Sequence, residues 1–161
     1  MSVDSVKEVA KACAARHLRL TPLRADVLRL VAESTLPVKA YDVLARIRKS
    51  TAITSPPTVY RALDFLLDNG FIHKLESINA FVACIAPQSS HIATFLVCDR
   101  CGAATELIEE HVRHLLANSS RAMKFAPHAR TQTLELHGLC ETCGGGGDAG
   151  SAILQVDLKD S

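Results

Sequence analysis

The chain has 161 residues, of which 48% are apolar, 22% are charged and only 4% are aromatic. These proportions predict a soluble globular protein of one domain or two small ones, and they exclude collagen, a coiled coil and wholesale disorder. No stretch approaches the roughly 18 consecutive apolar residues of a membrane helix, and the N-terminus lacks the apolar segment of a secretory signal. We therefore expect a cytoplasmic protein with no membrane segment.

The net charge of +1 conceals an uneven distribution of charged residues. Residues 1–80 contain 12 Lys and Arg against 8 Asp and Glu, whereas residues 81–161 contain 6 against 9. A basic half suits a polyanion such as nucleic acid, although the imbalance alone is a weak indication.

Apolar residues at helical spacing predict four helices in the first half of the chain. They fall at residues 3–15, 22–32, 40–49 and 56–69. Thr21-Pro22 is a helix-start signal, since Thr caps the first turn and Pro suits the first helical position. Asn69-Gly70 is a helix-stop signal, because both residues tolerate a left-handed conformation.

The fourth helix divides into an apolar face and a polar face, and the polar face carries Thr58, Tyr60 and Arg61. Two short strands are predicted after it, at residues 71–76 and 80–84, and they form a hairpin. Helices followed by a two-stranded wing are typical of a winged helix-turn-helix domain, whose last helix is presented for recognition.

The second half alternates strands, cysteine turns and one helix. We expect a strand at 92–97, a helix at 109–123 and a strand at 131–136, with a Cys-x-x-Cys turn after each strand. The predicted fold class is α+β. We expect a DNA-binding domain at residues 1–84, a hinge linker at 85–91, a second domain at 92–143 and a flexible Gly-rich tail at 144–161.

The two cysteine turns are Cys98-Asp-Arg-Cys101-Gly102 and Cys140-Glu-Thr-Cys143-Gly144. Without a secretory signal, paired cysteines favour metal ligation over disulfides. Four thiolates supply a closed tetrahedral zinc site with no open position, which is the pattern of a structural zinc rather than a catalytic one. The alternative is four buried or redox-active cysteines.

Four further residues near the junction of the two halves are candidate metal ligands: His73, Cys84, His91 and Glu106. Taken singly, each has an ordinary alternative, such as a surface His on the wing, a small apolar Cys, a linker His or a solvated Glu. His111 and His114 lie three apart on one helix and are interpreted as solvated, since no third ligand accompanies them.

Several motifs resemble the ferric uptake regulator family of metal-sensing repressors and, within it, the zinc-sensing branch. They are Arg19-Leu-Thr-Pro-Leu-Arg24, Pro56-Pro-Thr-Val-Tyr-Arg-Ala-Leu-Asp-Phe-Leu66, Gly70-Phe-Ile-His73-Lys74, Cys98-Asp-Arg-Cys101-Gly102 and His137-Gly-Leu-Cys140. The linker holds only His91, where the iron-sensing branch typically has a His-rich cluster. The loop between Cys84 and His91 is one residue shorter than in a close relative.

This resemblance implies a homodimer with an N-terminal winged helix and a C-terminal α/β dimerisation domain. It implies two zinc ions per monomer and no organic cofactor. The structural zinc falls on the four paired cysteines, and the regulatory zinc, a corepressor, falls on His73, Cys84, His91 and Glu106. The protein is then expected to bind operator DNA when zinc-loaded and to repress zinc uptake genes.

The resemblance also places Tyr60 and Arg61 at base-contacting positions of the recognition helix, beside Thr58. Lys and Arg side chains that contact phosphates set position and salt dependence without reading sequence. The candidates for such contacts are Arg19, Arg24, Lys39 and Lys74.

Three alternatives stay open at this point. A zinc enzyme needs an open metal position, which neither proposed site offers, and no hydrolase or phosphate-loop motif is present. A structural zinc-ribbon protein would leave the four junction residues without a shared purpose. A family member that senses iron, manganese or peroxide is the nearest rival, because only the ligand set separates it from a zinc sensor.

Overall fold

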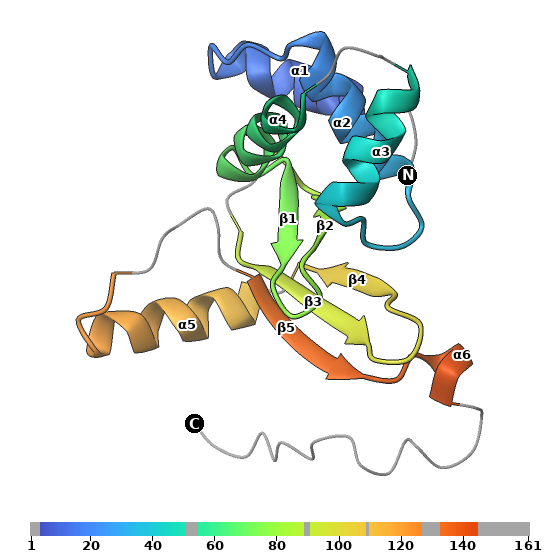
Figure 1. Ribbon diagram of the computed structural model, residues 1–161. Coiled ribbons are helices and arrows are strands. Elements are labelled where there is room, and N and C mark those ends of the chain that lie inside the picture. The colour runs from blue at the N-terminus through green and yellow to red at the C-terminus, as the bar shows by residue number, and fades with distance from the viewer. Residues whose placement is uncertain (1–3, 51–54, 89–90, 109, 127–132, 145–161) are drawn as a thin grey trace.

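The computed structural model describes residues 4–50, 55–88, 91–108, 110–126 and 133–144. The N-terminal helices lie above a small sheet, and a β-hairpin wing connects the two parts (Figure 1). The chain is a mixed helix-and-strand fold, as predicted. Among the described residues, no helix is long and apolar enough to cross a membrane.

The first half consists of α1 (Asp4–Ala15), α2 (Pro22–Glu33), α3 (Ala40–Ser50) and α4 (Pro56–Asp68). All four predicted helices are therefore present. Their apolar faces form one core, in which the largest fully buried side chains include Leu28, Ile47, Leu63 and Leu66. Cys13 is part of this core.

Both predicted helix boundaries have the expected caps. The Thr21 hydroxyl accepts the Arg24 N–H at 3.4 Å, with Pro22 in the first turn of α2. At the end of α4, Gly70 has φ +69°, and the Phe71 N–H donates to the Leu66 carbonyl at 2.9 Å. This is the left-handed closure that ends a helix and turns the chain into the wing.

The wing consists of β1 (Ile72–Leu75) and β2 (Ala80–Ala83), which pair antiparallel. Its two faces pack against different cores. Ile72 and Phe81 belong to the helical core, whereas Leu75 packs with Phe95 in a second cluster beneath the wing. The wing therefore lies between the two halves of the protein and packs against both.

The second half is a three-stranded sheet in the order β4-β3-β5. The strand β3 (Ala93–Cys98) pairs antiparallel with β4 (Ala104–Leu107) and parallel with β5 (Thr133–Gly138). The parallel pair requires a crossover, which contains α5 (Glu110–Ala122). Figure 1 shows α5 projecting from one side of the sheet.

Two elements of the second half were not predicted from the sequence. The strand β4 follows the first cysteine turn at once, and α6 (Glu141–Gly144) is a helical turn that begins directly after Cys140 and contains Cys143. The predicted Gly-rich tail, apart from Gly144, lies outside the described residues, and so do Ser89 and Ser90 of the predicted linker.

Candidate metal centres and DNA interface

The two Cys-x-x-Cys turns meet at the end of the sheet next to α6, remote from the four N-terminal helices (Figure 1). The Sγ atoms of Cys98, Cys101, Cys140 and Cys143 all lie within 4.8 Å of one another, and none forms a disulfide. The Sγ atoms of Cys101 and Cys140 are 3.8 Å apart. A tetrahedral site with Zn–S bonds of about 2.3 Å has S–S edges of about 3.8 Å, so the arrangement fits zinc.

Backbone N–H groups stabilise a thiolate in this sulfur cluster. Hydrogen bonds from the backbone N–H groups of Cys101 and Cys140 lower the pKa of the Cys98 thiol to about 6. The neighbouring sulfurs, Cys140 foremost, raise the pKa of Cys143 to about 12. Several thiolates cannot share so small a space without a compensating positive charge, and a bound divalent cation would supply that charge.

The turns are built differently from one another. Gly102 has φ +72°, and its N–H donates to the Cys98 carbonyl at 2.9 Å, so the first turn needs glycine. Gly144 is the last residue of α6, and its N–H donates to the Cys140 carbonyl at 2.8 Å. The second turn is therefore a helical one.

The four junction residues also come together, from the wing, the linker and the sheet. His73 lies on β1, Cys84 follows β2, His91 precedes β3 and Glu106 lies on β4, and their ligand atoms all lie within 4.8 Å of one another. Oε1 of Glu106 is 3.2 Å from Nε2 of His73 and 2.9 Å from Nε2 of His91. Sγ of Cys84 is 3.6 Å from that His91 nitrogen.

This junction cluster is enclosed. The His73 side chain is 6% exposed and the Glu106 side chain 3%. Nε2 of His73 makes no hydrogen bond in the described structure, although it is close to Glu106. A buried imidazole nitrogen without a hydrogen bond is costly, and a metal bond would satisfy it. The cluster therefore fits a metal on its own geometry.

The two acidic groups of the junction cluster have pKa values shifted in opposite directions. Burial, aided by the Glu106 carboxylate, raises the pKa of the Cys84 thiol to about 12. Burial also acts to raise the pKa of Glu106, but the nearby His73 imidazole, with hydrogen bonds from the Ile85 N–H and His91, outweighs it and leaves that pKa below its usual value. The cluster thus combines a carboxylate with a protonated thiol that must lose its proton before it binds a metal.

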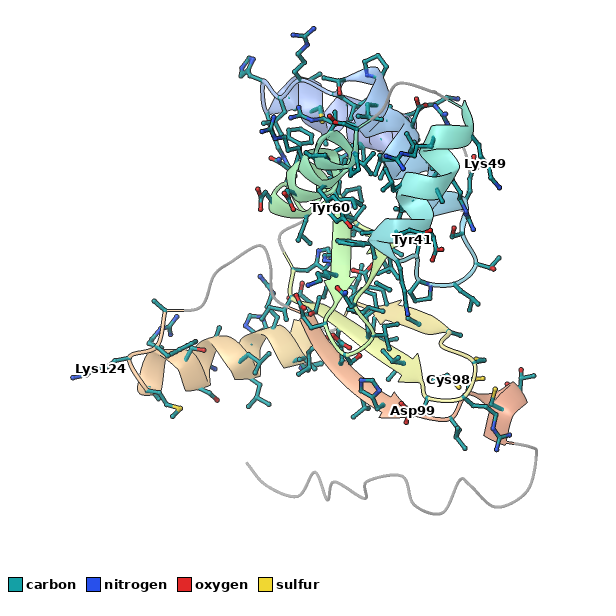
Figure 2. All side chains as sticks on the ribbon, viewed as in Figure 1. Tyr41, Lys49, Tyr60, Cys98, Asp99 and Lys124 are labelled. Atoms are coloured by element: carbon teal, nitrogen blue, oxygen red, sulfur yellow. The ribbon has the colours of Figure 1, made fainter. Side chains whose placement is uncertain are left out.

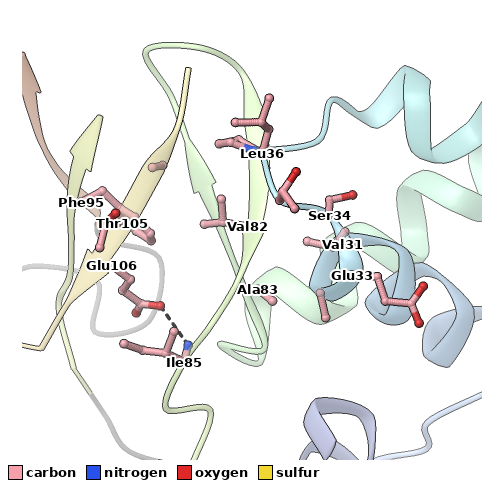
Figure 3. A pocket seen from close by; sticks show the side chains of 14 residues that line it. Val31, Glu33, Ser34, Leu36, Val82, Ala83, Ile85, Phe95, Thr105 and Glu106 are labelled. Atoms are coloured by element: carbon pink, nitrogen blue, oxygen red, sulfur yellow. Dashed lines mark hydrogen bonds between the residues drawn. The ribbon is translucent and has the colours of Figure 1, made fainter. Parts of the chain in front are cut away.

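Glu106 also faces a cleft between the two halves of the protein. The cleft has a volume of about 320 Å³ and lies between the segment after α2, the strand β2 and the strand β4. Figure 3 shows Glu106 at its wall, with its Oε2 accepting the Ile85 N–H at 2.9 Å.

The candidate DNA-binding side chains lie on the helical half. Thr58, Tyr60 and Arg61 are all exposed on α4, on the face predicted to be polar. Figure 2 shows Tyr60 on this helix and Tyr41 on the neighbouring α3. Tyr41 is 73% exposed and was not singled out from the sequence.

The four side chains predicted to contact phosphates differ in exposure and in their contacts within the protein. Arg19 and Lys39 are exposed. Lys74 pairs with Glu76 at 2.7 Å. Arg24 stacks 3.5 Å from the centre of the Phe65 ring and donates to the Arg19 carbonyl at 2.6 Å, so its guanidinium already has internal partners.

Glu135 connects the wing to the sheet, and sequence reasoning missed it. Its carboxylate on β5 accepts the Glu76 N–H at 2.7 Å and the Ser77 hydroxyl, both in the turn of the wing. His137, two residues further, donates to Asp99 at 2.8 Å, and Asp99 and Glu135 raise the pKa of this imidazole. A lone acid on a short strand gives no sequence signal for such a contact.

Comparison with known proteins agrees with this architecture. A sequence model of the Ferric uptake regulator family matches residues 15–137. The chain is 44% identical to the "Zinc uptake regulation protein" of Escherichia coli K12 over 141 residues, which cover 87% of this chain and 81% of the relative. It is 24% identical to the "Ferric uptake regulation protein" of Bacillus subtilis over 146 residues, which cover 88% of this chain and 96% of the relative.

Two solved structures share both sequence and arrangement. Holo XcZur is 53% identical, with a TM-score of 0.79 over 86% of this chain and 96% of that one. A zinc uptake regulator complexed with zinc and DNA is 42% identical, with a TM-score of 0.80 over 88% of this chain and 93% of that one. Apo XcZur, 50% identical over 88% of this chain and 97% of that one, gives a TM-score of only 0.51.

A winged helix joined to a small sheet domain, with ligand clusters at the junction and at the far end of the sheet, defines a metal-responsive winged-helix protein. The extent of the sequence match makes the assignment specific: the chain belongs to the ferric uptake regulator family. Its arrangement is more similar to that of holo XcZur than to that of apo XcZur.

Proposed function

We propose that this protein is a zinc-responsive transcription regulator, which binds operator DNA as a zinc-loaded homodimer and represses zinc uptake genes. One observation carries the proposal. Ligand atoms from the wing, the linker and the sheet lie within 4.8 Å of one another in an enclosed cluster. A metal bound there joins the DNA-binding half to the other half, so metal supply is linked to the position of the recognition helix.

The ligand chemistry supports zinc as the metal. One thiolate, two imidazoles and a carboxylate are a common set for tetrahedral zinc, whereas iron(II) and manganese sites prefer nitrogen and oxygen ligands. The relatives agree, since one is named for zinc uptake regulation and another was solved with zinc and DNA. Zinc is thus the proposed metal, and its proposed role is regulatory and not catalytic.

We assign two zinc ions to each chain, with different roles. The four-cysteine cluster is closed and remote from the DNA-binding half, which suits a structural zinc that stabilises the sheet domain. The junction cluster of His73, Cys84, His91 and Glu106 suits the regulatory zinc. When bound there, zinc supplies a divalent charge and a rigid set of bonds between segments that are otherwise joined by a short linker.

The protein's own residues perform the remaining steps. Glu106 presents one oxygen toward both imidazoles and uses the other to hold the Ile85 N–H, which fixes its orientation. The wing carries His73 and packs against α4, so holding His73 also holds the recognition helix. A coupling free energy of about 1–3 kcal/mol is usual for allostery, and a near-complete switch needs on the order of 5 kcal/mol.

On DNA, we propose that Arg61 reads a guanine edge and that Tyr60 contacts a thymine methyl or a phosphate, with Thr58 nearby. Arg19 and Lys39 are the phosphate contacts that the structure leaves most exposed, and Arg24 and Lys74 would have to exchange internal partners to take that role. Two recognition helices in a dimer would meet half-sites separated by about one helical turn or a multiple of it.

The exposed apolar surface of the second half supports the homodimer. Leu96, Leu134 and Leu136 are 42% to 54% exposed on neighbouring strands, on the sheet face opposite Phe95 and the wing. No described residue of α5 is buried, and Leu115 on it is 66% exposed. We expect a second copy of the chain to cover this apolar sheet face and α5, whose described residues pack against no core of their own chain.

The experiment that tests this function is a metal titration of DNA binding. Protein stripped of its junction metal is titrated with zinc, iron(II) or manganese(II), and binding to a zinc-uptake promoter is measured. We expect tight, specific binding with zinc at the lowest free concentration. Equal or better activation by iron(II) or manganese would instead assign the protein to another metal, and binding that ignores all three would refute a metal sensor.

A further inference from the structure

We propose that Arg16, at the end of α1, is a positioning residue for the regulatory zinc site. Its hydrogen bonds go to backbone carbonyls of Asn69 and Pro87. Its guanidinium holds the linker that leads from Cys84 to His91, so it sets where the second ligand lies relative to the first. This inference rests on the proposed function, because it gives α1 a part in the response of that same site.

The contacts of Arg16 join three parts of the chain. One guanidinium nitrogen donates to the Asn69 carbonyl at the end of α4, at 3.0 Å. The other donates to the Pro87 carbonyl in the linker, at 2.9 Å. The guanidinium carbon also lies 5.5 Å from the centre of the Phe71 ring. A planar fork with several donors can hold two carbonyls at once, which a lysine ammonium does with less geometric definition.

The rest of the linker is held in the same way. The Cys84 N–H donates to the Phe71 carbonyl at 3.1 Å, and the Ile85 N–H donates to Glu106 at 2.9 Å. Gln88 donates its side-chain amide to Glu8 on α1 at 2.8 Å. The described linker is therefore anchored at Cys84, Ile85, Pro87 and Gln88.

Anchoring the linker lowers the entropic cost of bringing its ends to one metal. A free segment between Cys84 and His91 would lose conformational freedom when both bind, and that loss would weaken binding. Pro87 already restricts the backbone, and Arg16 fixes its carbonyl against the helical half. Partners that orient metal ligands without touching the metal typically change metal affinity by about 10–100-fold.

The test measures zinc affinity rather than DNA binding. Wild type and Arg16→Gln, each with its structural zinc in place, are titrated with zinc in competition with a chromophoric chelator. We expect Arg16→Gln to weaken the regulatory site by about tenfold or more. Arg16→Lys should recover part of that loss because it can reach one carbonyl. Arg29→Gln is the matched control, since Arg29 pairs with Asp26 on the exposed face of α2.

A thermal melt of the same proteins separates positioning from simple stability. Arg16→Gln with a lower unfolding midpoint but unchanged zinc affinity would refute the inference. If Arg16→Gln loses its structural zinc, Gln88→Ala decides the question: affinity weakened by about threefold or more supports the anchored linker, and wild-type affinity refutes it. A wild type that binds no second zinc would refute the proposed function itself, whereas equal binding by wild type and variant refutes only the role of Arg16.

Discussion

Nε2 of His73 lies 3.2 Å from Oε1 of Glu106, although His73 is on the wing and Glu106 is on the far sheet. Among the described residues this His73 nitrogen has no hydrogen-bond partner, and both side chains are almost wholly buried. A contact between two domains is thus left incomplete at the point where His91 and Cys84 also converge. A cation bound at this pair would join the wing to the sheet.

The proton on Cys84 predicts how zinc binding depends on pH. Because burial raises the pKa of this thiol to about 12, the metal-free protein holds the proton at neutral pH and must release it when zinc binds. Higher pH therefore favours binding, and the apparent affinity of the regulatory site should rise about tenfold per pH unit between about pH 7 and about pH 9. Isothermal titration in buffers of different ionisation enthalpy would count the released proton. A Cys84→His variant, which keeps a ligand without a thiol, should show a flatter dependence, and an equally steep one would contradict the assignment.

Arg61 and Lys39 are predicted to affect DNA binding in different ways. Arg61→Ala should reduce discrimination between operator and scrambled DNA, at a cost of about 1–3 kcal/mol on the operator, because a base-edge contact is lost. Lys39→Ala should weaken both DNAs alike and lower the salt slope by about 1, because one phosphate contact is lost. Fluorescence anisotropy over a range of salt concentrations measures both quantities. Equal losses on both DNAs for Arg61→Ala would remove its reading role.

Glu135 is predicted to hold the wing in place without holding zinc. Glu135→Ala removes the acceptor for the Glu76 N–H and the Ser77 hydroxyl, each worth about 0.5–1.5 kcal/mol. We expect a loss of operator affinity of roughly threefold to tenfold, with zinc content unchanged, since the wing then moves more freely against the sheet. Glu33→Ala, which removes an exposed carboxylate from the end of α2, is the control. Operator affinity unchanged by Glu135→Ala would show that packing beneath the wing suffices to hold it.

Gly70 is predicted to be required for stability by its backbone alone. Its φ of +69° is strained for any other residue, and a Cβ there would meet nothing within 4 Å. Gly70→Ala should therefore cost about 1 kcal/mol of unfolding free energy, measured by denaturant melts of the zinc-loaded protein. Gly138→Ala is the matched control, because that site is equally open but has no left-handed φ. Similar losses at both positions would contradict the conformational explanation.

Features set by local chemistry were predictable from the sequence. The caps at Thr21 and Gly70 each depend on a few neighbouring residues, and both are present. The spacing of the cysteine pairs predicted that their sulfurs would meet, and the sulfurs do meet. The division of α4 into a buried and an exposed face also followed from helical periodicity.

Features that depend on distant segments were harder to predict. The approach of Glu106 to His73 requires β4, a four-residue strand directly after a turn, whose pattern is too short to identify. The sequence alone offered Glu106 as one of four candidate ligands near the junction, and the resemblance to a family grouped the four into one predicted site. Arg16 and Glu135 gave no signal, because single charged residues acquire meaning only from the carbonyls and N–H groups that folding brings to them.

The central claim is that each chain has a structural zinc and a separate zinc that controls DNA binding. The most direct test is zinc content per chain on purified protein, before and after mild chelation, with binding to promoter DNA measured on both samples. The account predicts two zinc ions falling to one, with DNA binding lost and then restored by added zinc. A single zinc retained throughout, with DNA binding unchanged, would leave the cysteine site in place and contradict the regulatory site at His73, Cys84, His91 and Glu106.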